Sequence, residues 1–111
     1  MNLAQWDIVR VRINPEDRDE HPAVIVSPNH VTQNPRVQKF NVLYCTKLPP
    51  ASGVAATQFV LNGSDGLEFR SVVDCSFFHV IRRDRITRRD GRVSGERIGA
   101  LRRRLREVLA L

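Results

Sequence analysis

Residues 21–28, His-Pro-Ala-Val-Ile-Val-Ser-Pro, form the stretch that constrains the fold most strongly. The run Ala23–Val26 is apolar and mostly β-branched, which favours a deeply buried strand. The next segment contains two prolines and two asparagines, residue types that interrupt regular structure. The sequence therefore predicts a strand over residues 21–27 and a loop over residues 28–39.

The pattern on either side of this strand is also that of short strands. Val9, Val11 and Ile13 alternate with Arg10 and Arg12, which predicts a strand over residues 7–13 with one buried face. The dipeptide Asp90-Gly91 is typical of a turn. Further strands are predicted over residues 40–46, 58–61 and 71–81, the last of them long enough to require a bend or a bulge. No helical crossovers separate these strands, so we expect a mostly antiparallel sheet.

The C-terminal segment has a helical pattern instead. Ile98, Leu101, Leu105 and Val108 recur at intervals of three and four residues, and Ser94 precedes them as a predicted N-cap. Most of the arginines of this segment are predicted to lie on the opposite face of the helix. We therefore predict a fold that is mainly β with a C-terminal α-helix, arranged as a small antiparallel β-barrel over residues 5–93 and a helix over residues 95–110.

The length of the chain is that of one domain. Its 111 residues are 41% hydrophobic and 27% charged, as in ordinary globular proteins. No stretch approaches the ~20 apolar residues that a membrane-spanning helix needs. The N-terminus lacks a basic region followed by an apolar core, so we expect a cytoplasmic protein with a single domain over residues 1–111 and no membrane partner.

The charge of the chain is concentrated at one end. Residues 82–111 contain eleven arginines and four acidic residues, whereas residues 1–81 contain seven basic and eight acidic side chains. Arginine binds phosphate and carboxylate groups in a bidentate manner. This basic segment indicates either a nucleic-acid or acidic protein partner, or a solvated helix face.

The two cysteines do not indicate a metal site. Cys45 and Cys75 each lie within an apolar run, and neither has a second cysteine or a histidine at zinc-ligand spacing. We expect both to be reduced and buried. The sequence thus predicts no metal and no cofactor.

Five stretches, in the same order along the chain, resemble the MazF/PemK (Kid-like) toxins of bacterial type II toxin–antitoxin systems. They cover Trp6–Val9, which is similar to "GDIV"; His21–Pro28, similar to "RPAVVxSP"; Val42–Thr46, similar to "VxPLTS"; Gly66–Cys75, similar to "GL…SVVxCDQ"; and His79–Ile86, similar to "RTIDKxRL". A C-terminal helix follows, as in the family. The ordered set is more specific than any one of these motifs.

The resemblance implies an SH3-like barrel that forms homodimers and is bound by an acidic antitoxin protein. It also implies a metal-independent endoribonuclease that cuts single-stranded RNA. In that reaction the ribose 2′-OH attacks the adjacent phosphate and leaves a 2′,3′-cyclic phosphate and a 5′-OH. A relative with the same fold, CcdB, instead poisons gyrase, so the fold does not fix the target.

The resemblance also implies candidate catalytic residues. The family threonine is matched by Thr46, but the family arginine is replaced by His21. Histidine is well suited to proton transfer near neutral pH, although it lacks the bidentate grip of arginine on phosphate. A family arginine and aspartate on the "VVxCD" strand are replaced by Asp74 and Ser76. A neighbouring loop, residues 15–20, carries four acidic residues that oppose an approaching phosphate.

Further residues are candidates for contact with RNA or antitoxin. The alternation places Arg10 and Arg12 on the outward face of the first strand, and it places His79 on the face of Cys75, where partial burial is expected. The aromatic residues Tyr44, Phe77 and Phe78 either stack on bases or, as the more frequent case, pack in the core. The full set of predicted contacts is Arg10, Arg12, Asp74, Ser76, His79, Arg82, Arg83 and Arg85.

A second hypothesis is a catalytically inactive or diverged barrel. It would bind nucleic acid or inhibit a protein target such as gyrase. The replacement of the family arginine and the acidic loop favour this reading.

Overall fold

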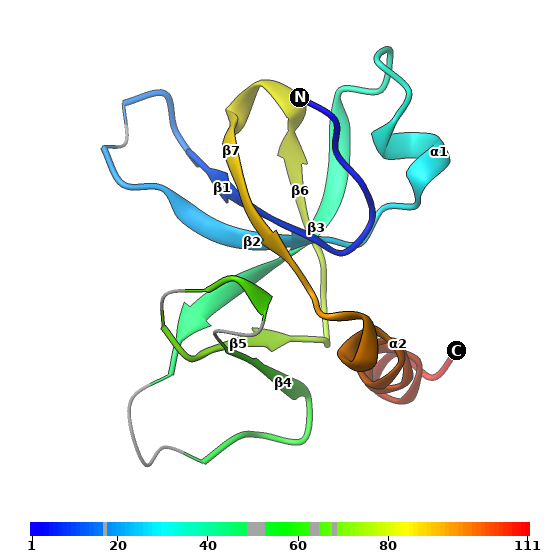
Figure 1. The fold of residues 1–111 in the computed structure, drawn as a ribbon. Coiled ribbons are helices and arrows are strands. Elements are labelled where there is room, and N and C mark those ends of the chain that lie inside the picture. The colour runs from blue at the N-terminus through cyan, green and yellow to red at the C-terminus, as the bar shows by residue number, and fades with distance from the viewer. Residues whose placement is uncertain (17, 49–52, 63–64, 68) are drawn as a thin grey trace.

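A bent antiparallel sheet with a C-terminal helix against it makes up the computed structural model of the chain (Figure 1). The structure describes residues 1–16, 18–48, 53–62, 65–67 and 69–111. The strands are β1 (Asp7–Val11), β2 (His21–Ile25), β3 (Lys39–Lys47), β4 (Gln58–Leu61), β5 (Ser71–Asp74), β6 (His79–Arg82) and β7 (Ile86–Arg92). The helices are α1 (Asn29–Thr32), the 3-10 helix η2 (Arg83–Arg85) and α2 (Gly95–Leu109).

Strand β3 organises the sheet. The strand order is β4-β5-β3-β2-β1-β7, with β6 also paired to β3, and each pair is antiparallel. The first half of β3 pairs with β6, where Phe40 lies opposite Ile81. Its last residues pair with β5, where Thr46 lies opposite Val72. The predicted fold class, mainly β with a barrel-like antiparallel sheet and a C-terminal helix, is confirmed.

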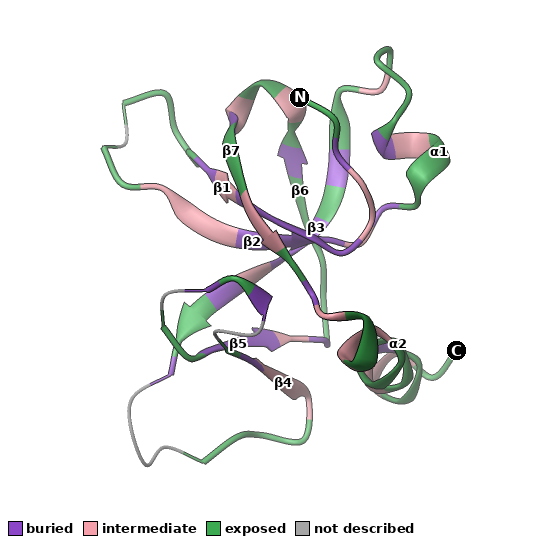
Figure 2. Cartoon of the chain, in the orientation of Figure 1, coloured by how far each residue is buried: buried purple, intermediate pink, exposed green. Residues whose placement is uncertain are grey.

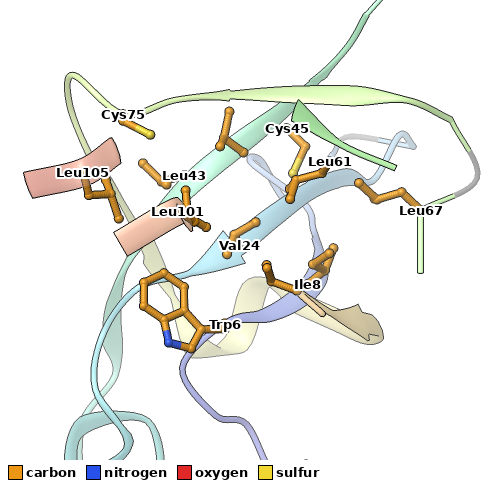
Figure 3. Packing of buried hydrophobic residues seen from close by; sticks show 12 residues of the cluster. Trp6, Ile8, Val24, Leu43, Cys45, Leu61, Leu67, Cys75, Leu101 and Leu105 are labelled. Atoms are coloured by element: carbon orange, nitrogen blue, oxygen red, sulfur yellow. The ribbon is translucent and has the colours of Figure 1, made fainter. Parts of the chain in front are cut away.

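The central strands are buried on both faces. Ile8 and Val9 are adjacent on β1, yet each is fully buried, because they belong to two different apolar clusters. Val24 lies in the first cluster, together with Leu101 and Leu105 of α2 (Figure 3). The prediction of one buried face for residues 7–13 was therefore wrong, while the deep burial predicted for residues 21–27 is confirmed over Ala23–Ile25.

The single long strand predicted over residues 71–81 is instead two separate strands, β5 and β6. Both pair with β3, and a turn at residues 75–78 separates them. Cys75 is buried within this turn, but Phe77 and Phe78 are 53% and 41% exposed. Core packing of these two rings was thus a wrong expectation, because the turn directs them away from both clusters.

The dipeptide Asp90-Gly91 lies inside β7 and not in a turn. Gly91 pairs with Ile8, and Arg89 pairs with Val9, so the irregular register lets Asp90 bulge out of the ladder. A side chain at residue 91 would approach the carbonyl oxygen of Asp65 to 2.7 Å. Glycine is therefore required here by close packing against a neighbouring loop.

Helix α2 follows its predicted pattern. Ser94 is the N-cap residue, and the apolar stripe packs on the first cluster, while the opposite face is exposed (Figure 2). Two arginines turn toward the sheet, contrary to the prediction. Arg97 binds the buried carboxylate of Asp65 and the Val60 carbonyl, and Arg104 Nη1 donates to the Ala56 carbonyl at 3.1 Å. These bonds attach the helix to β4 and to the loop that precedes it.

The segment 28–39 was predicted as a loop and contains the single turn of α1. It is held by Arg83, whose Nε donates to the Val37 carbonyl at 3.0 Å and whose Nη2 donates to the Thr32 and Asn34 carbonyls at 2.9 Å. Within the part of the chain that the structure describes, no helix is long and apolar enough to span a membrane.

Candidate functional site

The candidate site is built around Thr46 near the end of β3. In the β2–β3 ladder the last pair is Ala23 opposite Tyr44, so His21, the first residue of β2, lies near the end of β3 that carries Thr46. On the other side of β3, Thr46 pairs with Val72 of β5. The consecutive strands β2 and β3 therefore bring the predicted catalytic pair, His21 and Thr46, to one place.

These two residues line a pocket of about 390 Å³, which we call the basic pocket. Three of its side chains are basic: Arg10, His21 and Lys47. The remaining lining residues are Pro22, Cys45, Thr46, Leu67, Phe69 and Ser71. A hydroxyl group, an imidazole and two permanent cations thus face a space large enough for a phosphodiester group.

The two permanent cations of this pocket are held in different ways. Arg10 does not point outward as predicted: its side chain is 19% exposed, and its Nε donates to Asp90, which also accepts from Arg88 at 2.9 Å. Lys47 lies over the Phe69 ring, with Nζ at 4.2 Å from the centroid. Arg10 is therefore fixed by an ion pair, whereas among the described residues no ion pair holds the Lys47 ammonium.

Lys47 and Phe69 were missed by the sequence interpretation. Lys47 directly follows Thr46 but lies one residue beyond the strand predicted over residues 40–46, so it was not singled out. The pocket lies at the open end of the sheet, where residues of both faces contribute to its lining. Proximity in sequence to Thr46 was the available signal.

The described acidic residues of the 15–20 loop do not line the basic pocket. Of these residues, Glu16 and Asp19 are exposed and Glu20 is half-buried, and none of the three lines the pocket. Asp17 lies outside the described residues. The repulsion that the sequence suggested is thus not built into the described pocket wall.

A second pocket, of about 110 Å³, lies on the other side of Thr46. We call it the aromatic pocket, because three rings surround it. The centroid of the His79 ring lies 4.5 Å from that of Tyr44 and 5.1 Å from that of Phe77. Its lining residues are Tyr44, Thr46, Gln58, Val72, Asp74, Phe77 and His79.

His79 and Asp74 are both accessible in this pocket. His79 is exposed, so the expectation of partial burial was wrong. Asp74 Oδ1 accepts from the backbone N–H and the hydroxyl of Ser76. These bonds favour the charged form and hold the pKa of the Asp74 carboxyl below its usual range, with a smaller contribution from the Thr57 side chain. Asp74 is therefore an acceptor-only group at neutral pH.

The remaining predicted contacts are arginines. Arg12, Arg82 and Arg85 line a third hollow of about 210 Å³, which shares Tyr44 with the aromatic pocket. The exposed pair between Arg82 and Asp84 keeps the pKa of Asp84 low. Arg83 is different, because the carbonyls of residues 32–37 already accept from its guanidinium. The structure therefore joins all the predicted residues except Arg83 and Ser76 to these pockets, and Ser76 acts through Asp74.

The cysteines are poor nucleophiles in this structure. Burial raises the pKa of the Cys45 thiol to about 12 and that of the Cys75 thiol to about 11. Both are buried free thiols, as predicted. Among the described residues, no group of three metal-ligating side chains lies together.

Solved structures show the same fold. An endoribonuclease from a mycobacterial species, solved in complex with its cognate antitoxin, is 17% identical, with a TM-score of 0.78 and with 98% of this chain and 96% of that chain covered. The Mycobacterium tuberculosis toxin MazF-mt6 is 20% identical, with a TM-score of 0.75 and coverage of 95% and 97%. MazE–MazF from Deinococcus radiodurans is 15% identical, with a TM-score of 0.76 and coverage of 100% and 99%.

These identities show similarity of fold. No curated protein matches the sequence. A family model described as the PemK-like, MazF-like toxin of type II toxin–antitoxin systems matches residues 4–109. The match spans all seven strands and the C-terminal helix. The chain belongs to the PemK-like, MazF-like toxin family of type II toxin–antitoxin systems.

Proposed function

We propose that this toxin is a metal-independent endoribonuclease that cuts single-stranded RNA within the basic pocket. The observation that carries the proposal is that His21 and Thr46 line one pocket together with Arg10 and Lys47. One of the similar solved proteins supports the same activity, since it is described as an endoribonuclease.

The proposed reaction is an internal transesterification. The ribose 2′-oxygen attacks the adjacent phosphorus, the bond from phosphorus to the 5′-oxygen breaks, and a 2′,3′-cyclic phosphate forms. One proton leaves the 2′-OH and one proton must reach the 5′-oxygen. We assign proton transfer to His21, because an imidazole can both accept and donate a proton.

The other groups stabilise the phosphate while its charge increases. The Thr46 hydroxyl donates a hydrogen bond to a phosphate oxygen, and the ammonium of Lys47 and the guanidinium of Arg10 supply positive charge. Arg10 is already oriented by Asp90, so it needs little reorganisation when the phosphate binds. Asp90 in turn reduces the charge that Arg10 presents.

The test is to incubate the purified protein with a long single-stranded RNA in EDTA and to map the ends. We expect discrete cuts with 2′,3′-cyclic phosphate and 5′-OH ends, which disappear in His21→Ala and in Thr46→Ala while both variants remain folded. Wild-type rates in these variants would exclude the assigned residues, and intact RNA with the wild type would exclude the activity.

A toxin that binds nucleic acid without cutting it is the second candidate. One observation favours it: among the described residues, His21 is the only histidine in the basic pocket, whereas the reaction needs two proton transfers. This candidate predicts RNA binding that weakens steeply with salt and no cleavage under any condition.

We also propose a homodimer and an acidic antitoxin as the partners of this protein in the cytoplasm. Arg102, Arg103 and Arg106 line a hollow of about 330 Å³ on the exposed face of α2, and the third hollow adds Arg12, Arg82 and Arg85. Such surfaces attract an acidic peptide at low salt. Sedimentation of the purified toxin tests the dimer, and titration with the acidic product of an adjacent reading frame tests the partner.

A further inference from the structure

The aromatic pocket has no role in the proton transfers described above, yet it shares Thr46 with the basic pocket. A nucleotide whose phosphate lies in the basic pocket therefore has the aromatic pocket directly beside it. The volume of about 110 Å³ is well below the ~300 Å³ at which pockets for drug-sized ligands begin, so it suits one planar ring.

The walls of this pocket have the chemistry of a base-binding site. Phe77 is 53% exposed, and its ring meets His79 edge-on, with an interplanar angle of 69°. An exposed aromatic face is a sequence-tolerant platform for a nucleobase. Tyr44 of β3 also contacts the His79 ring, at a centroid distance of 4.5 Å, so the platform packs against β3 as well as against the turn.

The polar part of the pocket restricts which base fits. Asp74 offers only acceptor atoms, and Ser76 fixes its orientation. A carboxylate accepts well from an exocyclic amino group, such as N4 of cytosine. Uracil carries a carbonyl oxygen, O4, where cytosine carries N4, and this oxygen repels a carboxylate.

We propose that the aromatic pocket binds the RNA base next to the cleaved phosphodiester, that the exposed Phe77 ring, braced edge-on by His79, stacks on this base, and that Asp74 selects a base with an amino group over uracil. This proposal rests on the proposed function for the position of the cut, but base binding itself does not depend on cleavage. Asp74 also argues against an acidic peptide as the occupant, because two carboxylates repel each other.

The test measures binding before cleavage. Short oligocytidine and oligouridine with 2′-O-methyl groups lack the attacking hydroxyl, so fluorescence anisotropy reports their affinities without turnover. We expect the wild type to bind oligocytidine at least about five-fold more tightly than oligouridine, which corresponds to one good hydrogen-bonding contact to a base edge. Equal affinities would overturn the proposal.

Two variants separate the roles of the carboxylate and of the ring. Asp74→Asn is expected to remove most of the preference for oligocytidine, because the amide is no longer an acceptor-only group. Phe77→Leu is expected to weaken both oligonucleotides by roughly ten-fold, within the range measured for loss of a stacked base. Retained preference in the first variant, or retained affinity in the second, would contradict the assignment.

Matched controls come from neighbouring residues. Phe78→Leu removes an exposed ring on the same turn that does not line the pocket, and Asp19→Asn neutralises an exposed acid of the 15–20 loop. Both are expected to bind like the wild type. If Phe78→Leu weakens binding as much as Phe77→Leu, or if Phe77→Leu alters only self-association in sedimentation, the turn is a protein interface and the proposal fails.

Cleavage mapping then distinguishes the two proposals. Discrete cuts whose flanking base changes in Asp74→Asn support both. Cuts whose sequence is unchanged in Asp74→Asn support the endoribonuclease and exclude the base pocket. Base-selective binding without any cut supports the base pocket and excludes the endoribonuclease.

Discussion

The basic pocket and the aromatic pocket share Thr46 as a common wall but differ in every other respect. Arg10, His21 and Lys47 give the first pocket positive charge, whereas Tyr44, Phe77 and His79 give the second its flat rings. Charge attracts every phosphate of an RNA chain equally, while rings and a fixed carboxylate distinguish one base from another. We therefore expect phosphate binding and cleavage on the basic side of Thr46 and selection of the RNA base on the aromatic side.

The largest expected effect comes from the imidazole of the basic pocket. His21→Gln keeps a side chain that forms hydrogen bonds but removes the proton transfer, so we expect cleavage to slow by at least about 100-fold. Single-turnover cleavage of one labelled RNA measures this change. The matched control is His30→Gln, because His30 is exposed on α1 and lines none of the three pockets described around β3.

If His30→Gln slows cleavage as much as His21→Gln does, the effect is not specific to the basic pocket. Unchanged cleavage in His21→Gln would show that another group transfers the proton.

The difference in charge between the pockets predicts different salt dependence. Lys47→Gln removes one phosphate contact, so the slope of log affinity against log salt should decrease by about 0.7, the value for single strands. Phe77→Leu should weaken binding without changing this slope. Anisotropy titrations at several salt concentrations measure both, with Lys39→Gln, at the opposite end of β3, as the matched control.

An identical slope for wild type and Lys47→Gln would mean that Lys47 does not contact phosphate. A reduced slope in Phe77→Leu would mean that the aromatic pocket also contributes to phosphate binding.

The carboxylate of the aromatic pocket predicts a pH effect. The hydrogen bonds from Ser76 lower the pKa of Asp74, so Ser76→Ala should raise this pKa toward its ordinary value of ~3.9, although the backbone donor remains. The pKa of Asp74 is lower in the folded protein than in the unfolded chain. The charged carboxylate therefore stabilises the fold above about pH 4, and this contribution to stability is lost as the pH falls below that value. An NMR titration of the Asp74 carboxyl carbon measures the shift.

Ser94→Ala serves as the control for that titration, since the Ser94 side chain makes no capping hydrogen bond. An Asp74 midpoint that is the same in wild type and Ser76→Ala would show that the hydroxyl does not set the charge of the pocket.

The smallest effect is expected from thiol reagents. Cys45 lines the basic pocket, but burial raises its pKa to about 12, so almost no thiolate is present at pH 7. Iodoacetamide should therefore leave the native protein unlabelled and its RNA affinity unchanged, whereas unfolding in urea should expose both cysteines. Rapid labelling of the native protein, read by mass spectrometry, would contradict the burial of these thiols.

Much of the fold could be predicted from local patterns. The strand at residues 21–25 and the stripe on α2 follow from periodicities within a few residues of sequence. The wrong predictions share a cause: Asp90-Gly91 resembles a turn locally, but pairing with β1 and the close approach of Asp65 keep it in a strand. Contacts between residues that are far apart in the sequence do not appear in local sequence patterns.

The candidate site, like the fold, could be predicted only in part from the sequence. His21 and Thr46 were identified by resemblance and are brought together by the β2–β3 ladder, while their catalytic roles stay predictions. Lys47 was missed, because nothing local in the sequence indicates that consecutive residues of β3 line the same pocket. Arg83 was expected at the ligand surface but holds the loop before β3 instead.

The sequence by itself determined the antiparallel β architecture, the closing helix and the basic C-terminal segment, because alternation, helical spacing and charge are properties of neighbouring residues. The tertiary structure alone decided which arginines are bound by Asp7, Asp65 and Asp90 and which remain on the surface. It also decided that Thr46 separates a basic pocket from an aromatic one. These features depend on contacts between distant strands, which the packing of two apolar clusters on opposite faces of β1–β3 brings together.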